Sequence, residues 1–124
     1  MELNIEIETQ DDKLSSSLFE TSGKLESGKT QKTLGEDVTI RYEGEQIALA
    51  EAVPTVIRIT MYIGERVLLH TAAYMLSRYL YDKLRARRDN NLKINDNQVN
   101  INVREIEQLI INISSEEHER TENE

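Results

Sequence analysis

The chain has 124 residues, a length typical of a single domain, so we expect one hydrophobic core. Its 23 acidic and 15 basic residues give a formal net charge of −8 at pH 7, which disfavours binding to nucleic acids and to anionic membrane surfaces. The lack of cysteine excludes disulfides, zinc sites with thiolate ligands and cysteine nucleophiles.

Residues 1–10 predict a strand. Leu3, Ile5 and Ile7 alternate with polar residues, which is the period of a strand that buries one face. The same segment has neither a positively charged start nor an apolar run, so it does not resemble a secretory signal peptide. We therefore expect a cytoplasmic protein.

A short helix and a loop are expected next. Leu14, Leu18 and Phe19 recur at helical spacing, although the serines between them are weak helix formers. Residues 21–36 are rich in Gly, Ser, Lys and Thr and offer almost nothing to bury. This composition predicts a flexible loop.

The following segment predicts a second strand and then a helical stretch. Val38, Ile40 and Tyr42 alternate with polar residues, as in a half-buried strand, and the pattern stops at Gly44. The composition of Glu45–Val53 favours a helix.

From Pro54 to about Arg88 the pattern predicts one long helix. Proline is tolerated in a first helical turn, and no further proline follows. Apolar side chains would cover more than half of the circumference of a helix about 50 Å long. Such a helix must be buried in lipid or in protein. We expect no membrane span, because charged or titratable residues interrupt the stretch at Arg58, Glu65, Arg66, His70 and Arg78.

A chain of this size has little remaining surface with which to cover such a helix. We therefore expect the helix to pack against a protein partner or a second copy of the chain, and a dimer is the leading form. The residues expected to form this interaction surface are Ile57, Met61, Ile63, Leu68, Met75, Tyr79 and Leu80. In the alternative interpretation, the sheet and the flanking helices cover the helix within the chain.

The last third of the chain predicts a hairpin, a helix and a tail. Residues 89–91 are turn formers that end the long helix. Apolar alternation on both sides of an Asn-Asp-Asn turn predicts a hairpin over 92–102. Apolar residues at three-and-four spacing then predict a helix at about 103–114. Residues 115–124 are polar and mostly acidic, so a disordered tail is expected.

These elements together predict an α+β fold. A small sheet of about four strands, formed by the N-terminal strand, the central strand and the C-terminal hairpin, would pack on the long apolar helix, with a short C-terminal helix beside it. One domain would span residues 1–114, with the loop at 21–36 inside it and the acidic disordered tail at 115–124 after it.

Residues 23–30, Gly-Lys-Leu-Glu-Ser-Gly-Lys-Thr, match the sequence pattern of a phosphate-binding loop. In such a loop Gly23 and Gly28 would let backbone amides wrap a phosphate. Lys29 would neutralise the phosphate, and the Thr30 hydroxyl would bind Mg²⁺. The pattern needs a buried strand before it and a helix that begins at the lysine, and the sequence predicts neither. A chance match is the favoured interpretation, and a phosphate- or nucleotide-binding protein is the alternative.

The sequence shows no catalytic set, and we expect no metal site and no cofactor. His70 and His118 are its two histidines, so a histidine metal site would depend on carboxylates. Arg85, Arg87 and Arg88 form a basic cluster where the long helix ends. Cations in the last helical turn complement the helix dipole, and this is a sufficient reason for the cluster.

The second half of the chain combines a long apolar helix that ends in Tyr79-Leu80-Tyr81-Asp82-Lys83-Leu84, a polar hairpin and a short helix. Over roughly residues 48–113 it resembles the effector-associated constant component proteins of bacterial conflict systems. This resemblance implies a small non-catalytic partner that accompanies effector or signalling proteins in defence modules, and it identifies no functional residue.

We therefore expect a non-enzymatic protein-interaction or assembly module, with a role as an accessory component of a prokaryotic defence or signalling system implied by the resemblance. A second alternative to this function is a small acidic inhibitor from a virus or mobile element, whose negative surface would imitate nucleic acid and occupy a basic site.

Overall fold

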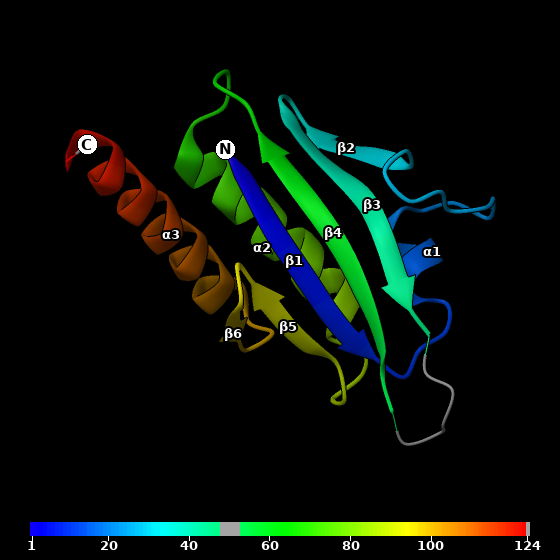
Figure 1. Cartoon of the computed structure of the whole chain (residues 1–124). Helices are drawn as coiled ribbons and strands as arrows, with labels where there is room; N and C mark the ends of the chain where they lie inside the picture. Colours follow the sequence, from blue (N-terminus) through cyan, green and yellow to red (C-terminus); the bar gives the residue numbers. More distant parts are fainter. Residues whose placement is uncertain (48–52, 124) are drawn as a thin grey trace.

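A computed structural model describes residues 1–47 and 53–123, with side chains described as far as Glu117. In this part of the chain an antiparallel sheet of six strands is packed against three helices (Figure 1). The elements in chain order are β1 (Glu2–Thr9), α1 (Leu14–Leu18), β2 (Gln31–Gly35), β3 (Val38–Gln46), β4 (Thr55–Ile63), α2 (Leu69–Leu84), β5 (Asn91–Ile94), β6 (Asn97–Val99) and α3 (Val103–Asn123).

The first strand of the chain lies inside the sheet, whose order is β2-β3-β4-β1-β5-β6. Strand β1 pairs with β4 on one side and with β5 on the other, so that Ile5 lies between Ile59 and Ile94. The start of the chain therefore lies beside β5, a strand that follows it by more than eighty residues. Strands β2 and β6 form the two edges.

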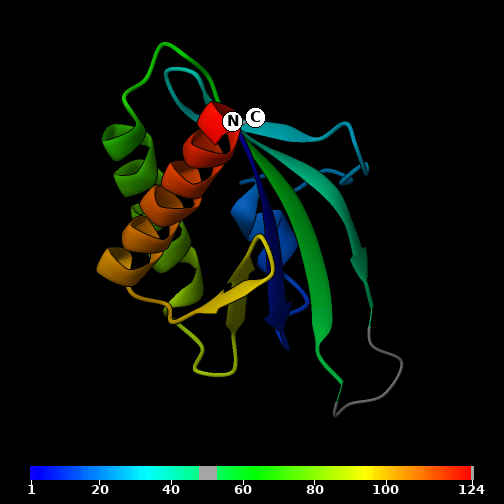
Figure 2. The same ribbon diagram turned by 60° about the vertical axis from the view of Figure 1, so that its left-hand side comes forward.

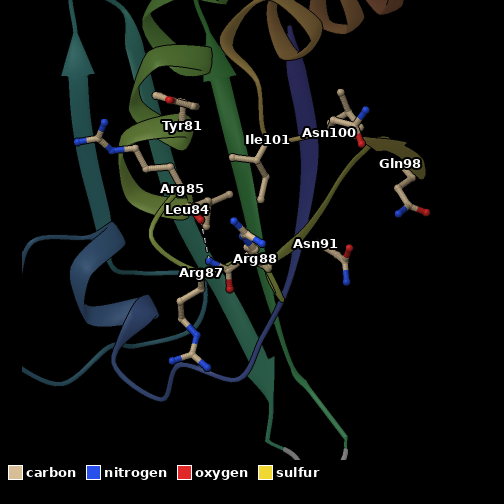
Figure 3. A pocket seen from close by; sticks show the side chains of 11 residues that line it. Tyr81, Leu84, Arg85, Arg87, Arg88, Asn91, Gln98, Asn100 and Ile101 are labelled. Atoms are coloured by element: carbon tan, nitrogen blue, oxygen red, sulfur yellow. Dashed lines mark hydrogen bonds between the residues drawn. The ribbon is translucent and has the colours of Figure 1, made fainter.

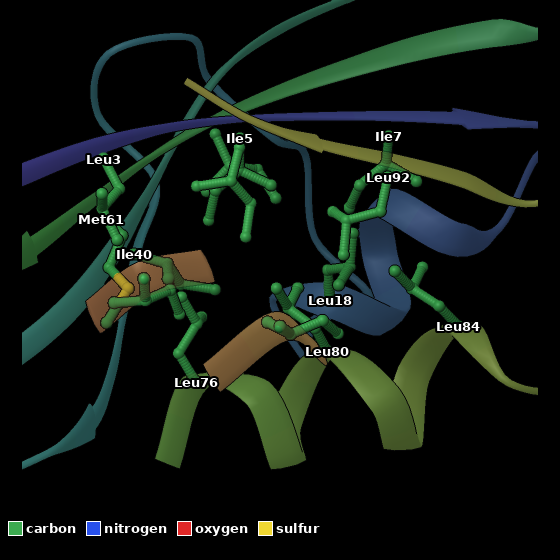
Figure 4. Close-up of a cluster of buried hydrophobic side chains, with 14 of the residues drawn as sticks. Leu3, Ile5, Ile7, Leu18, Ile40, Met61, Leu76, Leu80, Leu84 and Leu92 are labelled. Carbon is green, nitrogen blue, oxygen red and sulfur yellow. The ribbon is translucent and has the colours of Figure 1, made fainter. Parts of the chain in front are cut away.

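The sheet has one covered and one open face. Helices α2 and α3 lie on the same side of the sheet, as two views of the molecule show (Figures 1 and 2). Alternate residues of the strands point toward these helices and form a continuous core with them (Figure 4). The fully buried side chains of this core include Leu3, Ile5, Ile7, Ile57, Met61, Leu76, Leu80, Leu84, Leu92, Ile94 and Ile106.

The α+β class is confirmed, but residues 54–88 do not form one helix, and this prediction was wrong. Residues 55–63 form β4, which pairs with β3 and β1, and α2 begins only at Leu69. The segment is rich in β-branched residues, which favour a strand over a helix, and its alternate side chains enter the core. The apolar surface that one helix would have shown nearly all round is divided between one face of β4 and one face of α2.

The residues predicted to form an interaction surface do not lie on one exposed surface. Ile57, Met61, Ile63 and Leu80 are buried in the core, with at most 6% of their surface exposed. Met75 and Tyr79 pack against the same core and are half-buried. Leu68 alone among them is strongly exposed, at 77%. Because α2 is covered within the chain, its apolar surface no longer gives a reason to expect a dimer.

The described residues contain two strands more than the predicted four, namely β4 and β2. Strand β2 lies within the segment expected to be a loop, and β3 continues through a bulge between Tyr42 and Gly44 to Gln46 instead of ending at the glycine. Gly44 has a φ of 127°, which a glycine adopts without strain. Residues 48–52 of the expected helical stretch lie outside the described residues, while Glu45 and Gln46 belong to β3.

The C-terminal hairpin is confirmed, and the helix after it is longer than expected. Asn95 and Asp96 both have positive φ, at 48° and 66°, and they form the two-residue turn between β5 and β6. Helix α3 continues to Asn123, where we expected a disordered tail after Ser114. No Gly or Pro interrupts this acidic segment, and Glu is a good helix former, so the helix can propagate through it. None of the helices in the described part of the chain has the length and hydrophobicity needed to cross a membrane.

Candidate functional site

A pocket of about 460 Å³ lies between the C-terminal end of α2 and the β5–β6 hairpin (Figure 3). Its volume falls in the range of known ligand sites. We call it the arginine pocket, because Arg85, Arg87 and Arg88 contribute its charged side chains. Its polar amides are Asn90, Asn91, Gln98 and Asn100, and its apolar wall is formed by Tyr81, Leu84, Val99 and Ile101.

The local sequence places the arginines where α2 ends. Leu84 is fully buried and anchors the last helical turn in the core. The Arg85 N–H still donates to the Tyr81 carbonyl (3.0 Å), after which the chain turns toward β5. The side-chain amide of Asn90 donates to the Leu84 carbonyl (3.0 Å) and so satisfies one of the carbonyls left free at a helix end. Arg85 is the C-cap residue, where a cation complements the helix dipole, whereas Arg87 and Arg88 lie beyond the end of the helix, outside the last turn in which they were expected; all three line the cavity.

The arginines differ in how far their charge is compensated. Arg87 forms two hydrogen bonds of 3.1 Å with the carboxylate of Asp89. This pairing raises the pKa of Arg87 and lowers the pKa of Asp89, in both cases chiefly through the side-chain hydrogen bonds. The Arg85 guanidinium lies 5.7 Å from the centre of the Tyr81 ring. Arg85 and Arg88 are exposed, and within the described residues neither of them forms an ion pair.

Asn90 adds a second unusual feature to the pocket wall. Only 6% of its surface is exposed, and its Oδ1 is buried without a hydrogen-bond donor among the described residues. A buried acceptor in this state costs about 1–3 kcal/mol. A donor group that reached this oxygen would recover part of that free energy.

The pocket lining suits binding better than catalysis. Its charged side chains are arginines, and its other polar groups are amides and the Tyr81 hydroxyl. General acid–base chemistry needs a group that gains and loses a proton near neutral pH, and a carboxylate or histidine does not line this cavity. The described residues also contain no group of three or more His, Asp or Glu side chains that could hold a metal ion.

The open face of the sheet holds a smaller hollow of about 300 Å³, in which Glu6, Glu43 and Arg58 are ion-paired, while Asp96 has no ion pair among the described residues. Arg58 Nε lies 3.4 Å from Glu6 Oε1, across the β1–β4 pair. Arg41 is hydrogen-bonded to Glu43 and lies 5.1 Å from the centre of the Tyr62 ring. This face therefore has the polar, self-paired character of a solvated sheet surface.

The glycines of the phosphate-loop pattern do not form an amide nest. The Gly23 N–H donates to Thr21 Oγ1 (3.0 Å), and the Gly28 N–H donates to the Tyr42 carbonyl (2.7 Å). Gly28 has a φ of 76°, which serves a tight turn that docks the loop on β3. Both N–H groups therefore donate to acceptors within the chain, and they do not point toward a common site where a phosphate could bind.

Lys29 and Thr30 are likewise engaged within the loop. Their N–H groups both donate to the Glu26 carbonyl (3.0 Å), and Thr30 Oγ1 accepts from the Glu26 N–H (2.8 Å). The ammonium of Lys29 lies 4.0 Å from the Glu26 carboxylate. A strand, β2, follows the loop where the pattern needs a helix, and no strand directly precedes it. The geometry gives the phosphate-loop interpretation no support.

The sequence drew attention to the arginines but not to the other residues that line the pocket. Gln98 and Asn100 lie ten or more residues further along the chain, and their place beside the arginines depends on the hairpin folding back along the sheet. A run of polar amides after a basic cluster was the one available signal, and it is a weak one because such residues are common in turns.

The chain matches no family model, no curated protein and no solved structure in the comparisons with known proteins. Its function is therefore argued from the arginine pocket and the fold around it.

Proposed function

We propose that this chain is a non-enzymatic protein-interaction module that binds an acidic segment of a partner protein in the arginine pocket. The observation that carries the proposal is the pair Arg85 and Arg88, which line a cavity of about 460 Å³ without an internal counter-charge. Arginines in this state favour carboxylates, to which a guanidinium can donate two parallel hydrogen bonds.

The net charge of the whole chain limits which classes of anionic ligand are expected to bind in the pocket. A net charge of −8 repels a polyanion such as DNA or RNA over long distances. At physiological ionic strength the Debye length is about 8 Å, so a short acidic segment in the pocket experiences mainly the nearby arginines. The amides of Asn90, Asn91, Gln98 and Asn100 can pair with the N–H and C=O groups of a peptide.

The resemblance to effector-associated constant components extends the proposal to the biological role. On that reading, the acidic segment belongs to an effector or signalling protein of the same defence system. A second copy of the chain is the other occupant to be tested, because the chain is itself acidic, with a net charge of −8.

The proposal is tested by measuring the affinity of a capped acidic peptide, acetyl-Val-Glu-Val-Glu-Val-amide, against the matching peptide with lysines in place of glutamates. The acidic peptide should bind, and the basic one should not. Arg88→Glu should weaken binding of the acidic peptide by about tenfold or more, since it turns an attraction into a repulsion. Arg66→Glu changes the net charge equally at an exposed loop position outside the pocket and should have little effect.

Two outcomes would overturn the proposal. One is the absence of acidic-peptide binding at millimolar concentration, and the other is an equal loss of affinity in both variants, which would show a general charge effect. Light scattering of the free protein over a wide concentration range tests the second copy as an occupant. If the protein self-associates and Arg88→Glu abolishes this, the ligand of the pocket is a second copy of the chain and not another protein.

A further inference from the structure

Strand β6 ends the sheet beside the arginine pocket. It pairs with β5 on one side and has no strand on the other in the described part of the chain. Edge strands present backbone N–H and C=O groups that can pair with another chain, and proteins protect such edges with short strands, charged residues or proline. β6 consists of Asn97, Gln98 and Val99, so it has neither a charged residue nor a proline, and its three residues offer a short edge for pairing.

The turn before β6 determines which backbone groups point outward. Asn95 and Asp96 form a two-residue turn with positive φ at both positions, and the pairs Ile94–Asn97 and Lys93–Gln98 follow from it. In such a hairpin the pair next to the turn is hydrogen-bonded and the following pair is not. The N–H and C=O of Gln98 therefore point to the free edge.

The arginine pocket reaches this edge. Residues 98–101 are consecutive, and all of them line the pocket. Gln98 and Val99 belong to β6, and Asn100 and Ile101 follow it directly, so the cavity reaches the C-terminal end of this edge strand. Gln98 and Asn100 are both exposed there (Figure 3).

The edge and the arginines together favour one kind of occupant. An extended segment that paired with Gln98 would lie beside the arginine pocket on the side of Arg88, whereas Arg85 extends away from Gln98 over the Tyr81 ring (Figure 3). A basic segment would be repelled, and an acidic one would gain both ladder hydrogen bonds and charge-assisted bonds. Backbone pairing supplies affinity in this mode, and side chains supply specificity.

We infer that the acidic segment binds as an added strand on β6, paired with the backbone of Gln98 and with a carboxylate on Arg88. This inference rests on the proposed function and specifies how the same pocket is used. It predicts that the ligand must be extended and that one edge of the ligand backbone is engaged while the other remains free.

Backbone methylation of the acidic peptide tests this geometry. In an extended peptide, the amides of alternate residues face the same edge. Methylating the nitrogens of residues two and four should therefore have a different effect from methylating those of residues three and five. One of the two peptides should bind about tenfold or more weakly than the parent, because each methyl group removes a donor and blocks the approach of β6, and the other should bind as the parent does.

A matched pair of protein variants gives an independent readout. Gln98→Pro removes the outward N–H and is tolerated by an edge strand that does not use that donor in its ladder, whereas Gln98→Ala keeps the N–H. Peptide binding should be lost in the first variant and retained in the second. Circular dichroism and the Tm show whether each variant is folded. If Gln98→Pro is unfolded, the two methylated peptides still test strand addition.

The outcomes separate the two proposals. If the parent peptide binds but both methylated peptides bind equally well, strand addition is overturned and acidic recognition by the pocket stands. If neither methylated peptide binds and Gln98→Ala also abolishes binding, recognition depends on the Gln98 side chain, and strand addition is again overturned. If no acidic peptide binds at millimolar concentration, both proposals fall.

Discussion

The side-chain amide of Asn90 donates a 3.0 Å hydrogen bond to the carbonyl of Leu84 and closes the end of α2 around which the arginines gather. Leu84 is held in the core, so the bond ties the turn that carries Arg87 and Arg88 to a rigid part of the molecule. The position of the pocket thus depends on one helix end. Four further predictions test this and other features of the fold.

Asn90→Ala should destabilise the protein by about 1 kcal/mol. The substitution leaves the buried Leu84 carbonyl without its donor, at a cost of about 1–3 kcal/mol, and this loss is offset in part because the unpaired Oδ1 is removed as well. Urea denaturation measures the change. Asn91→Ala, at an exposed neighbouring position, should stay within about 0.5 kcal/mol of the parent chain. Equal effects of the two substitutions would contradict the role assigned to Asn90.

Gly64→Ala should destabilise the loop between β4 and α2. A Cβ at Gly64 would lie 2.0 Å from Asp37 Oδ2, which accepts a 2.9 Å hydrogen bond from the Arg66 N–H. Relief of this overlap requires the carboxylate to leave that bond, at a cost of about 1–3 kcal/mol. Thermal unfolding should show a lower Tm for this variant. Gly23→Ala is the control, because its Cβ would meet nothing nearer than 3.4 Å, and a comparable loss of Tm there would refute the explanation.

Leu80→Ala and Leu68→Ala should separate core from surface among the residues first expected to form an interface. Leu80 is 2% exposed, and its truncation should cost about 2–5 kcal/mol through lost burial and a cavity. Leu68 is 77% exposed, so its truncation should change the free energy of unfolding by less than about 0.5 kcal/mol. Chemical denaturation of both variants checks this ordering, and a reversed order would support the single long helix that the structure replaces.

Glu20 should contribute to the pH dependence of stability. Its side-chain hydrogen bond with Lys32, and after that the one with Lys83, lowers its pKa from the ordinary value of 4.5. A carboxyl group whose pKa is lower in the folded state stabilises the fold above its unfolded pKa, and this contribution is lost as the pH falls through the folded value. Glu20→Gln should therefore show a smaller fall in Tm than the parent chain on acidification from pH 7 to below pH 4.5.

The matched control for this comparison is Glu36→Gln, at an exposed position without an ion pair in the described residues. Its Tm should fall with pH as much as that of the parent chain. If Glu20→Gln follows the same curve as Glu36→Gln, the cluster that joins Glu20 to Lys32 and Lys83 has no measurable linkage to folding.

Local periodicity was sufficient to predict the strands whose residues alternate between a solvent-exposed face and a buried face. The Leu3–Ile7 strand, the strand that begins at Val38 and the hairpin with its Asn-Asp turn were all predicted, because their patterns report one buried face and a specific turn. The segment 55–63 was misassigned, since its outward side also carries apolar or long side chains at Val56 and Tyr62 and the alternation is blurred.

The candidate site was predictable only in part. Arg85, Arg87 and Arg88 are adjacent in sequence, so their clustering was visible, and the helix dipole explained it locally. Whether a basic helix end is solvated or lines a cavity depends on what packs beside it. The β5–β6 hairpin supplies that neighbour, and its position follows from the pairing of β5 with β1, almost ninety residues away in the chain.

The sequence by itself determined the α+β composition, the alternation of most strands, the hairpin turn and the concentration of positive charge at one helix end, because each depends on residues within a few positions of one another. Tertiary structure decided that β1 lies inside the sheet, that α2 is covered within the chain and that the arginines line a pocket beside the β5–β6 hairpin. These features arise from long-range pairing, in which a strand is stabilised by whichever distant segments complete its hydrogen bonds and bury its apolar face.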